Sequence, residues 1–129
     1  MSPSPANRIA VLFGGMSLER EVSLRSGHRV ADALTSSGHD VTLVDVGPDL
    51  VARLLDGDFD LAFLTLHGAA GEDGTIQSIL DLVGLPYTGP DAQASALAWN
   101  KPGAQGLYHR AGARVPANLT LSQTAFRDL

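Results

Sequence analysis

Two polar residues of this chain follow short apolar runs that lead into glycine-rich segments. Glu19 follows the run Ile9–Phe13 and a double glycine, and His67 follows the run Leu61–Leu66. A carboxylate held at the mouth of a sheet can pair with an ammonium group, in a charge-assisted contact worth about 1.5 to 3 kcal/mol. An imidazole at the same edge can donate to a substrate carboxylate. The two residues together predict a site for an amino acid or an amine.

Each of these residues also has an ordinary structural explanation. Glu19 would serve equally as a first-turn glutamate that complements a helix dipole, and His67 as a histidine bonded to local backbone. Lys101, which follows Trp99 and Asn100, is either a solvated lysine at a helix end or a point charge that contacts nucleotide phosphates. No serine or cysteine nucleophile accompanies His67 in a recognisable motif, so it need not act as a general base.

Apolar runs bounded by glycine alternate with helical patterns over most of the chain. We expect parallel strands at 9–13, 41–44, 61–66 and 85–88, and helical apolar spacing at 22–34, 50–55 and 76–83. Ser17 suits the N-cap of the first helix. Short connections favour right-handed crossovers, so the fold class is α/β: a Rossmann-like three-layer domain with about four parallel strands, order 2-1-3-4, and helices on both faces. Ligands bind such sheets outside the carboxyl ends of the strands, the edge at which Glu19 and His67 are expected.

After Asp91 the pattern changes to alanine-rich helix. We expect one helix over 92–101, an interruption at Pro102-Gly103, a second helix over 104–111 and a strand over 118–121.

The composition is typical of one globular domain and argues against several function classes. With 9 Lys and Arg against 14 Asp and Glu, the chain has no basic stripe, so we expect no nucleic-acid partner. It has 0 Cys and its four histidines lack ligand spacing, so we expect neither disulfides nor a metal site. No signal-peptide pattern is present, and no apolar run approaches the roughly 20 residues that span a bilayer. We therefore expect a cytoplasmic protein without membrane contact.

Two motifs resemble the amino-terminal domain of the D-alanine:D-alanine ligase family. The segment Gly14–Ser23 reads GGMSLEREVS and is similar to the family's GG-x-S-x-E-x-E-V-S signature. Residues 66–77 contain LHG and GEDGTIQ and are similar to its LHG…GEDG-T-[IL]-Q segment. The likeness continues in the same order through residues 84–98 to Lys101, and covers the chain from about Arg8 to Leu121.

The resemblance implies an activity and a role for four residues. Members of that family use ATP to ligate two D-alanine molecules for peptidoglycan precursors, through an acyl phosphate on the first substrate. By resemblance Glu19 would hold the ammonium of the first D-alanine, Val22 would line that pocket, and His67 would lie close to the same substrate. Lys101 would reach the nucleotide phosphates. D-alanine is thus the implied substrate, with ATP and Mg²⁺ as cofactors of the complete enzyme.

Departures from the family pattern change what we expect of this chain. Asn100 stands where the family usually has aspartate, and the second lysine commonly found a few residues beyond Lys101 is missing. The residues of the family's ATP-grasp portion have no counterparts in this sequence. We therefore expect that ATP and Mg²⁺ do not bind fully to this chain, and that the isolated chain is inactive. We assign residues 1–7 to a disordered tail, 8–100 to the ligase amino-terminal domain, and 101–129 to a linker and the start of a truncated central domain.

Three interpretations remain open at this point. The first is a substrate-side domain that a missing or separate ATP-grasp half completes, with homodimerisation, common in the resembled family, as a further expectation. The alternative is a noncatalytic small-amino-acid-binding or regulatory module derived from the ligase. The third is an inert leftover whose apolar residues are poorly covered and promote association, such as Leu107, Val115, Leu119, Leu121 and Phe126.

Overall fold

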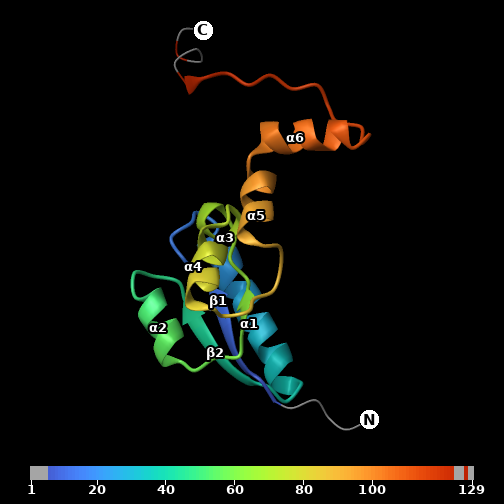
Figure 1. Cartoon of the computed structure of the whole chain (residues 1–129). Helices are drawn as coiled ribbons and strands as arrows, with labels where there is room; N and C mark the ends of the chain where they lie inside the picture. Colours follow the sequence, from blue (N-terminus) through green and yellow to red (C-terminus); the bar gives the residue numbers. More distant parts are fainter. Residues whose placement is uncertain (1–5, 124–126, 128–129) are drawn as a thin grey trace.

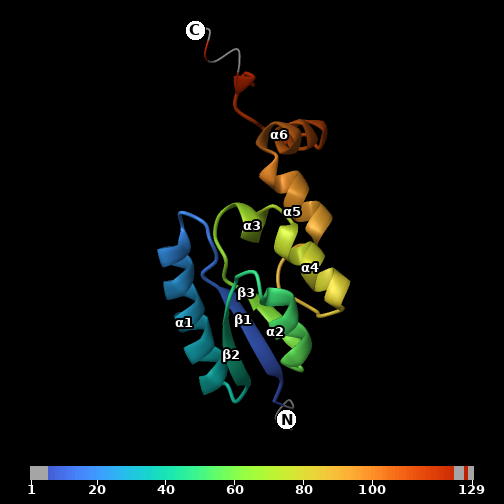
Figure 2. The same cartoon turned by 90° about the vertical axis from the view of Figure 1, so that its left-hand side faces the viewer.

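The centre of the molecule is a parallel three-stranded sheet. The computed structural model describes residues 6–123 and Arg127. Strands β1 (Arg8–Phe13), β2 (Asp40–Asp45) and β3 (Leu61–Leu64) lie in the order β2-β1-β3, with β1 in the middle (Figures 1 and 2). This confirms the predicted α/β class and the order of the first three strands.

Helices cover both faces of this sheet, as the sequence predicted. Helix α1 (Arg20–Ser36) lies on one side of the sheet, and α2 (Leu50–Asp56) and α4 (Thr75–Val83) lie on the other (Figure 2). Successive side chains of a strand point to opposite faces, so β1 contributes to two separate cores. Ile9 and Val11 pack toward α1, whereas Ala10 and Leu12 pack toward α2 and α4. All four are buried, which makes β1 the apolar axis of a three-layer domain.

The predicted fourth strand is reduced to an isolated bridge. Tyr87 pairs in parallel with Ala62 on the open side of β3, where a fourth strand was expected. Ala62 accepts from the amide of Thr88 at 3.1 Å. The next amide, that of Leu64, donates to Thr88 Oγ1 instead of to a carbonyl, at 3.1 Å. Because a side chain takes the place of the next backbone partner, the ladder stops after one bridge.

Two helices extend from the sheet layers toward the carboxyl terminus. Helix α5 (Ala92–Trp99) meets α6 (Lys101–Arg110) at Asn100, and both lie beyond the short helix α3 (Ala69–Glu72) at one end of the domain (Figures 1 and 2). The second helix therefore begins three residues earlier than predicted. The Asn100 side chain accepts from the amide of Gly103 at 3.2 Å, and proline is well tolerated in a first helical turn.

Two other expectations are wrong: Ser17 as the N-cap of the first helix, and a strand over residues 118–121. Helix α1 is preceded by Glu19, and Ser17 accepts from the Glu19 amide at 2.9 Å in the turn before the helix. Residues 118–121 form no strand, because Leu119 and Leu121 are exposed and no neighbouring strand pairs with them within the part of the chain described. Phe126 and residues 1–5 of the predicted tail lie outside the described residues.

Candidate functional site

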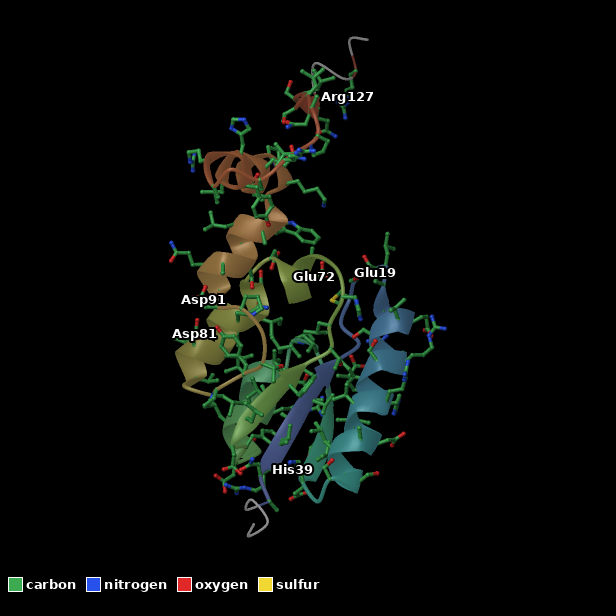
Figure 3. All side chains as sticks on the ribbon, turned by 90° about the vertical axis from the view of Figure 1, so that its right-hand side faces the viewer. Glu19, His39, Glu72, Asp81, Asp91 and Arg127 are labelled. Atoms are coloured by element: carbon green, nitrogen blue, oxygen red, sulfur yellow. The ribbon has the colours of Figure 1, made fainter. Side chains whose placement is uncertain are left out.

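Two loops meet at the carboxyl ends of β1 and β3. We call residues 14–19, between β1 and α1, the first loop, and residues 65–74, between β3 and α4, the second loop. Figure 3 shows Glu19 at the start of α1 and Glu72 on α3 at the same end of the sheet, with His39 at the opposite end. This is the edge that the topology predicts for ligands.

A buried serine ties the two loops together. Ser23 is 0% exposed, and its Oγ accepts from the amide of Gly14 at 2.8 Å. The same hydroxyl donates to the carbonyl of Thr65 at 2.8 Å. One side chain on α1 thus joins the end of β1 to the end of β3. This role of Ser23 was not predicted from the sequence. The signal for it is that the small residues Ser23, Gly27 and Ala31 recur every four residues and so mark the buried face of α1.

An ion pair holds the first loop from the other side. Arg20 donates through both terminal nitrogens to the two carboxylate oxygens of Asp45, at 2.7 and 2.5 Å. The Gly15 amide donates to Asp45 Oδ1 at 3.1 Å, and Arg20 also donates to the Gly15 carbonyl at 3.0 Å. Hydrogen bonding from the Arg20 guanidinium lowers the pKa of Asp45 below its ordinary value. This pair was not predicted from the sequence. Arg20 begins α1 and Asp45 ends β2, so the two residues are far apart along the chain.

The first loop is fitted closely to that ion pair. Gly14 has φ +73°, and a Cβ atom there would collide with Asp45 Oδ1 and with Arg20 Nη1. Only glycine combines this conformation with this approach. Gly14 therefore lets the guanidinium and the carboxylate close over the backbone.

Glu19 lies against the second loop, next to His67. Gly68 has φ +82°, and a Cβ atom added to this glycine would lie 3.8 Å from Glu19 Oε1. The side chain of Glu19 is not engaged by an ion pair among the described residues, and the residue is exposed. The structure therefore places the solvent-facing carboxylate of Glu19 near Gly68, the residue that follows His67.

His67 faces the same helix that carries Glu19. Its Nε2 lies 3.3 Å from Ser26 Oγ on α1. Glu19, Val22 and Ser26 are spaced by three and four residues, so they follow one another along one face of the helix start. Val22 is 40% exposed on that stripe. Three of the four predicted site residues, Glu19, Val22 and His67, thus gather on the α1 side of the two loops.

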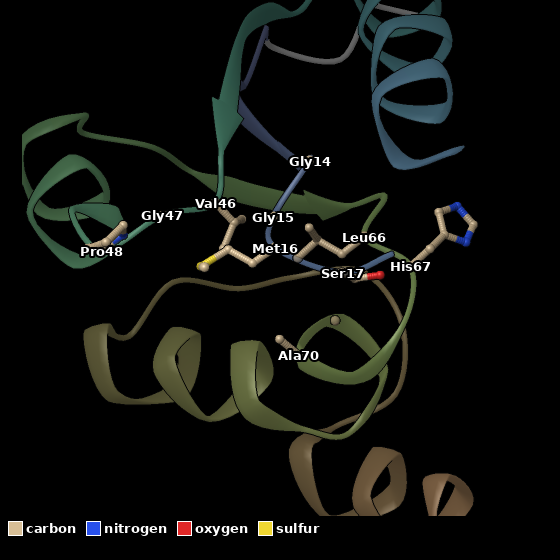
Figure 4. A pocket seen from close by; sticks show the side chains of 11 residues that line it. Gly14, Gly15, Met16, Ser17, Val46, Gly47, Pro48, Leu66, His67 and Ala70 are labelled. Carbon is tan, nitrogen blue, oxygen red and sulfur yellow. The ribbon is translucent and has the colours of Figure 1, made fainter. Parts of the chain in front are cut away.

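An apolar cavity lies on the other side of the same loops. It has a volume of about 290 Å³. Its apolar lining residues are Met16, Val46, Pro48, Leu66 and Ala70. Figure 4 shows these side chains turned toward one another, while the imidazole of His67 points away from them. His67 and Ser17 also line this cavity, whereas Glu19 and Val22 do not, so His67 borders both the apolar space and the polar residues of α1.

The comparisons with known proteins agree with the motifs. A family model described as "D-ala D-ala ligase N-terminus" matches residues 8–53 and 50–90. The chain belongs to this family. Among curated relatives of this family, the D-alanine–D-alanine ligase of Pseudomonas fluorescens (strain Pf0-1) is 46% identical over 125 residues, which are 97% of this chain and 39% of the relative. That of Halalkalibacterium halodurans is 49% identical over 114 residues, covering 88% of this chain and 37% of the relative. The chain thus spans less than half the length of these ligases.

Solved ligase structures share the fold. D-alanine–D-alanine ligase from Bacillus anthracis complexed with ATP superposes with a TM-score of 0.82 at 30% identity, over 94% of this chain and 40% of that one. The VanG D-Ala:D-Ser ligase from Enterococcus faecalis superposes with a TM-score of 0.76 at 28% identity, over 96% of this chain and 47% of that one.

Lys101 lies apart from the other predicted site residues of this ligase domain. It is exposed at the start of α6, and its Nζ lies 5.4 Å from the centroid of the Trp99 ring. It also lies beyond the residues that the family model matches, whereas Glu19, Val22 and His67 lie within them. A single exposed lysine beside an aromatic ring does not by itself form a phosphate cradle.

The described residues contain neither a candidate metal site nor a candidate membrane span. Within residues 6–123 and Arg127, no group of three or more His, Cys, Asp or Glu side chains could hold a metal ion. Over the same residues, no helix has the length and apolar character needed to cross a membrane.

Proposed function

We propose that this domain holds the first D-alanine of the D-alanine:D-alanine ligase reaction on the α1 side of the two loops. The observation that carries the proposal is the approach of Glu19 to Gly68, beside His67. The likeness to ligases from several bacteria supports the choice of substrate. The structure supports the proposal because the carboxylate of Glu19 and the small apolar side chain of Val22 lie at the start of α1, and the His67 imidazole faces the same helix.

Each of these side chains has a distinct role in the proposed site. The Glu19 carboxylate accepts hydrogen bonds from the ammonium group of D-alanine. The His67 imidazole, steadied by Ser26, donates to the substrate carboxylate. Val22 contacts the methyl group. Glu19 and His67 are thus the proposed catalytic residues that touch the substrate, and neither is asked to act as a nucleophile.

The rest of the reaction is assigned to an ATP-grasp half. ATP would supply the phosphoryl group that activates the D-alanine carboxylate, with Mg²⁺ bound by that half. Lys101 would contribute one positive charge toward the phosphates. Since the chain spans only 37 and 39% of the two relatives, we expect no ligation by the chain alone.

A binding experiment tests the substrate site directly. We would titrate the purified chain with D-alanine and record the amide resonances of both loops, with L-alanine as the matched ligand. D-alanine should shift amides of residues 17–26 and 66–72. Glu19→Gln should weaken this binding roughly ten- to hundred-fold, as the loss of one charge-assisted contact predicts. Glu21→Gln, an equal change of charge one helical position away from the stripe, should leave the binding unchanged.

An activity experiment then separates ligase from binding module. Phosphate release from ATP and D-alanine should be seen only when the chain is mixed with a separately made ATP-grasp half, and Glu19→Gln should abolish it. Binding of D-alanine without turnover in the mixture would favour the noncatalytic module instead. If D-alanine shifts no resonance of the wild-type chain, or Glu19→Gln binds it equally well, the proposed site is wrong.

A further inference from the structure

A second cavity lies between the sheet edge and the helices that follow it. It has a volume of about 280 Å³. Its walls come from five segments: Leu64 on β3, Gly71 on α3, Gln77 on α4, Thr88 at the isolated bridge, and Ser95 on α5. Gly71 also lines the apolar cavity beside His67, so the backbone at this residue borders both cavities.

Two buried polar atoms in the walls of this cavity lack partners. Gln77 and Ser95 are each 3% exposed. The amide nitrogen of Gln77 donates to the carbonyl of Gly71 at 3.0 Å. Its Oε1 and the Oγ of Ser95 have no hydrogen-bond partner among the described residues. A buried polar atom left in this state costs about 1 to 3 kcal/mol, and the great majority of such atoms are satisfied by protein or ordered water.

The chemistry of the two atoms defines what would satisfy them. Gln77 Oε1 can only accept, whereas the Ser95 hydroxyl can donate and accept. Water is the smallest molecule that donates to the first and accepts from the second. A cavity of about 280 Å³ has room for several water molecules, since each occupies roughly 30 Å³ in the liquid. An apolar molecule would leave both atoms unsatisfied.

We propose that this cavity is a structural hydration site, in which ordered water accepts from the Ser95 hydroxyl and donates to Gln77 Oε1. Both residues line the cavity, so one water can lie between the two atoms. Gln77 then holds the Gly71 carbonyl with one end and the water with the other. The bridge joins α5 to the turn that borders His67, which makes Gln77 and Ser95 positioning residues for the second loop.

Ordered water at this place can be observed in the wild-type chain. A high-resolution crystal structure should show at least one water within hydrogen-bond distance of both Gln77 Oε1 and Ser95 Oγ. In solution, the side-chain amide protons of Gln77 should show cross-relaxation with a long-lived water. A direct hydrogen bond between Ser95 and Gln77, or an apolar occupant with no water, would overturn the proposal. Neither measurement needs a variant, so folding failure cannot obscure the result.

A matched pair of variants tests the positioning role. Ser95→Ala should remove or displace the bridging water, shift the Gln77 side-chain amide resonances, and move the amide resonances of Gly71 and His67. Ser78→Ala removes a hydroxyl from the same region, but that hydroxyl donates to the Gly74 carbonyl within its own helix at 2.9 Å. Gly74 is the last residue of the second loop, so this substitution acts at that end only. It should leave the water and the amide resonances of Gly71 and His67 unchanged. Equal effects of the two substitutions would contradict a bridge specific to Ser95.

Discussion

The two loops lie at the same edge of the sheet, yet they are held in different ways. The first loop is held by side chains that are distant from it in sequence: Ser23 binds the amide of Gly14, and Asp45 binds that of Gly15. The second loop is tied to α1 near its start, where Ser23 donates to the Thr65 carbonyl and His67 lies beside Ser26. From Gly68 onward it is held by close neighbours, since the amide of Gly68 donates to Glu72 Oε1 at 3.2 Å.

The difference predicts how each loop responds to substitution. The conformation of the first loop depends on the packing of α1 and β2 around it, so a change in either element reaches it. The second loop carries much of its own support, because Asp73 also accepts from the amide of Thr75 at 2.9 Å and Gln77 holds the carbonyl of Gly71. Substitutions around the first loop should therefore be the more damaging.

The largest effect is expected from Gly14→Ala. The new Cβ would adopt an unfavourable positive φ and would collide with the Asp45 carboxylate and the Arg20 guanidinium. We expect a loss of about 2 to 4 kcal/mol in the free energy of unfolding, from strain and displaced hydrogen bonds together. Chemical denaturation of the two purified chains measures it.

Gly15→Ala is the control that separates strain from collision. Gly15 has φ +75°, almost the same as Gly14, but its Cβ would meet only Leu66 Cδ2, at an ordinary 3.5 Å. This variant should lose only the cost of the left-handed conformation, about 1 to 2 kcal/mol. If the two alanine variants are equally stable, the ion pair does not constrain the first loop.

A somewhat smaller loss is expected from Ser23→Ala. The substitution removes the acceptor of the Gly14 amide and the donor to the Thr65 carbonyl, both in a buried place. Leaving such groups unpaired costs about 1 to 3 kcal/mol. Hydrogen exchange should quicken at Gly14 in particular. Ser37→Ala removes an exposed hydroxyl that donates to Ala33 at 2.9 Å, and should change stability little.

The same contrast explains how much could be predicted from the sequence. Local signals were sufficient for the alternation of strands and helices, because apolar runs and bounding glycines lie next to what they specify. The strand order β2-β1-β3 followed from the topology expected of a parallel sheet with short connections. Motif resemblance was sufficient for the family. The approach of Glu19 to the second loop also follows from topology, since the ends of β1 and β3 meet at one edge.

What could not be predicted depends on pairs of residues far apart in the chain. Nothing in the spacing of Arg20 and Asp45 marks them as partners, because their contact depends on the register of β2 beside β1. The shortened fourth strand depends in the same way on Thr88 Oγ1 competing for the Leu64 amide. Such contacts are decided by three-dimensional packing, which one sequence does not display.

Asp45→Asn tests the ion pair by its pH dependence. Because the pKa of Asp45 is lowered in the folded chain, its stabilising effect is present above its ordinary pKa of 3.8 and is lost as the pH falls through the lower folded value. The stability difference between wild type and variant should be constant above about pH 5 and should shrink below about pH 4. Asn can still accept from the Gly15 amide, and the side chains of the pair are each 41% exposed, so we expect less loss than for Ser23→Ala.

A second aspartate sets the background of that measurement. The pKa of Asp60 is also lowered, first by the backbone amide of Arg8 and then by the Arg8 side chain, at the opposite end of the sheet. Wild type and Asp45→Asn both retain this group, so the difference between their urea midpoints isolates Asp45. A difference that stays constant down to pH 2, or grows on acidification, would contradict the ion pair.

The smallest effect is expected from Glu72→Gln in the second loop. Glutamine keeps an oxygen that can accept from the Gly68 amide, and the residue is exposed, so solvent replaces what the lost charge contributed. The free energy of unfolding should change by less than about 0.5 kcal/mol. Amide exchange at Gly68 should keep its wild-type rate, whereas Glu72→Ala, which removes the acceptor, should raise it. If Glu72→Gln destabilises the chain as much as Ser23→Ala does, the second loop is not held locally, and the contrast between the two loops fails.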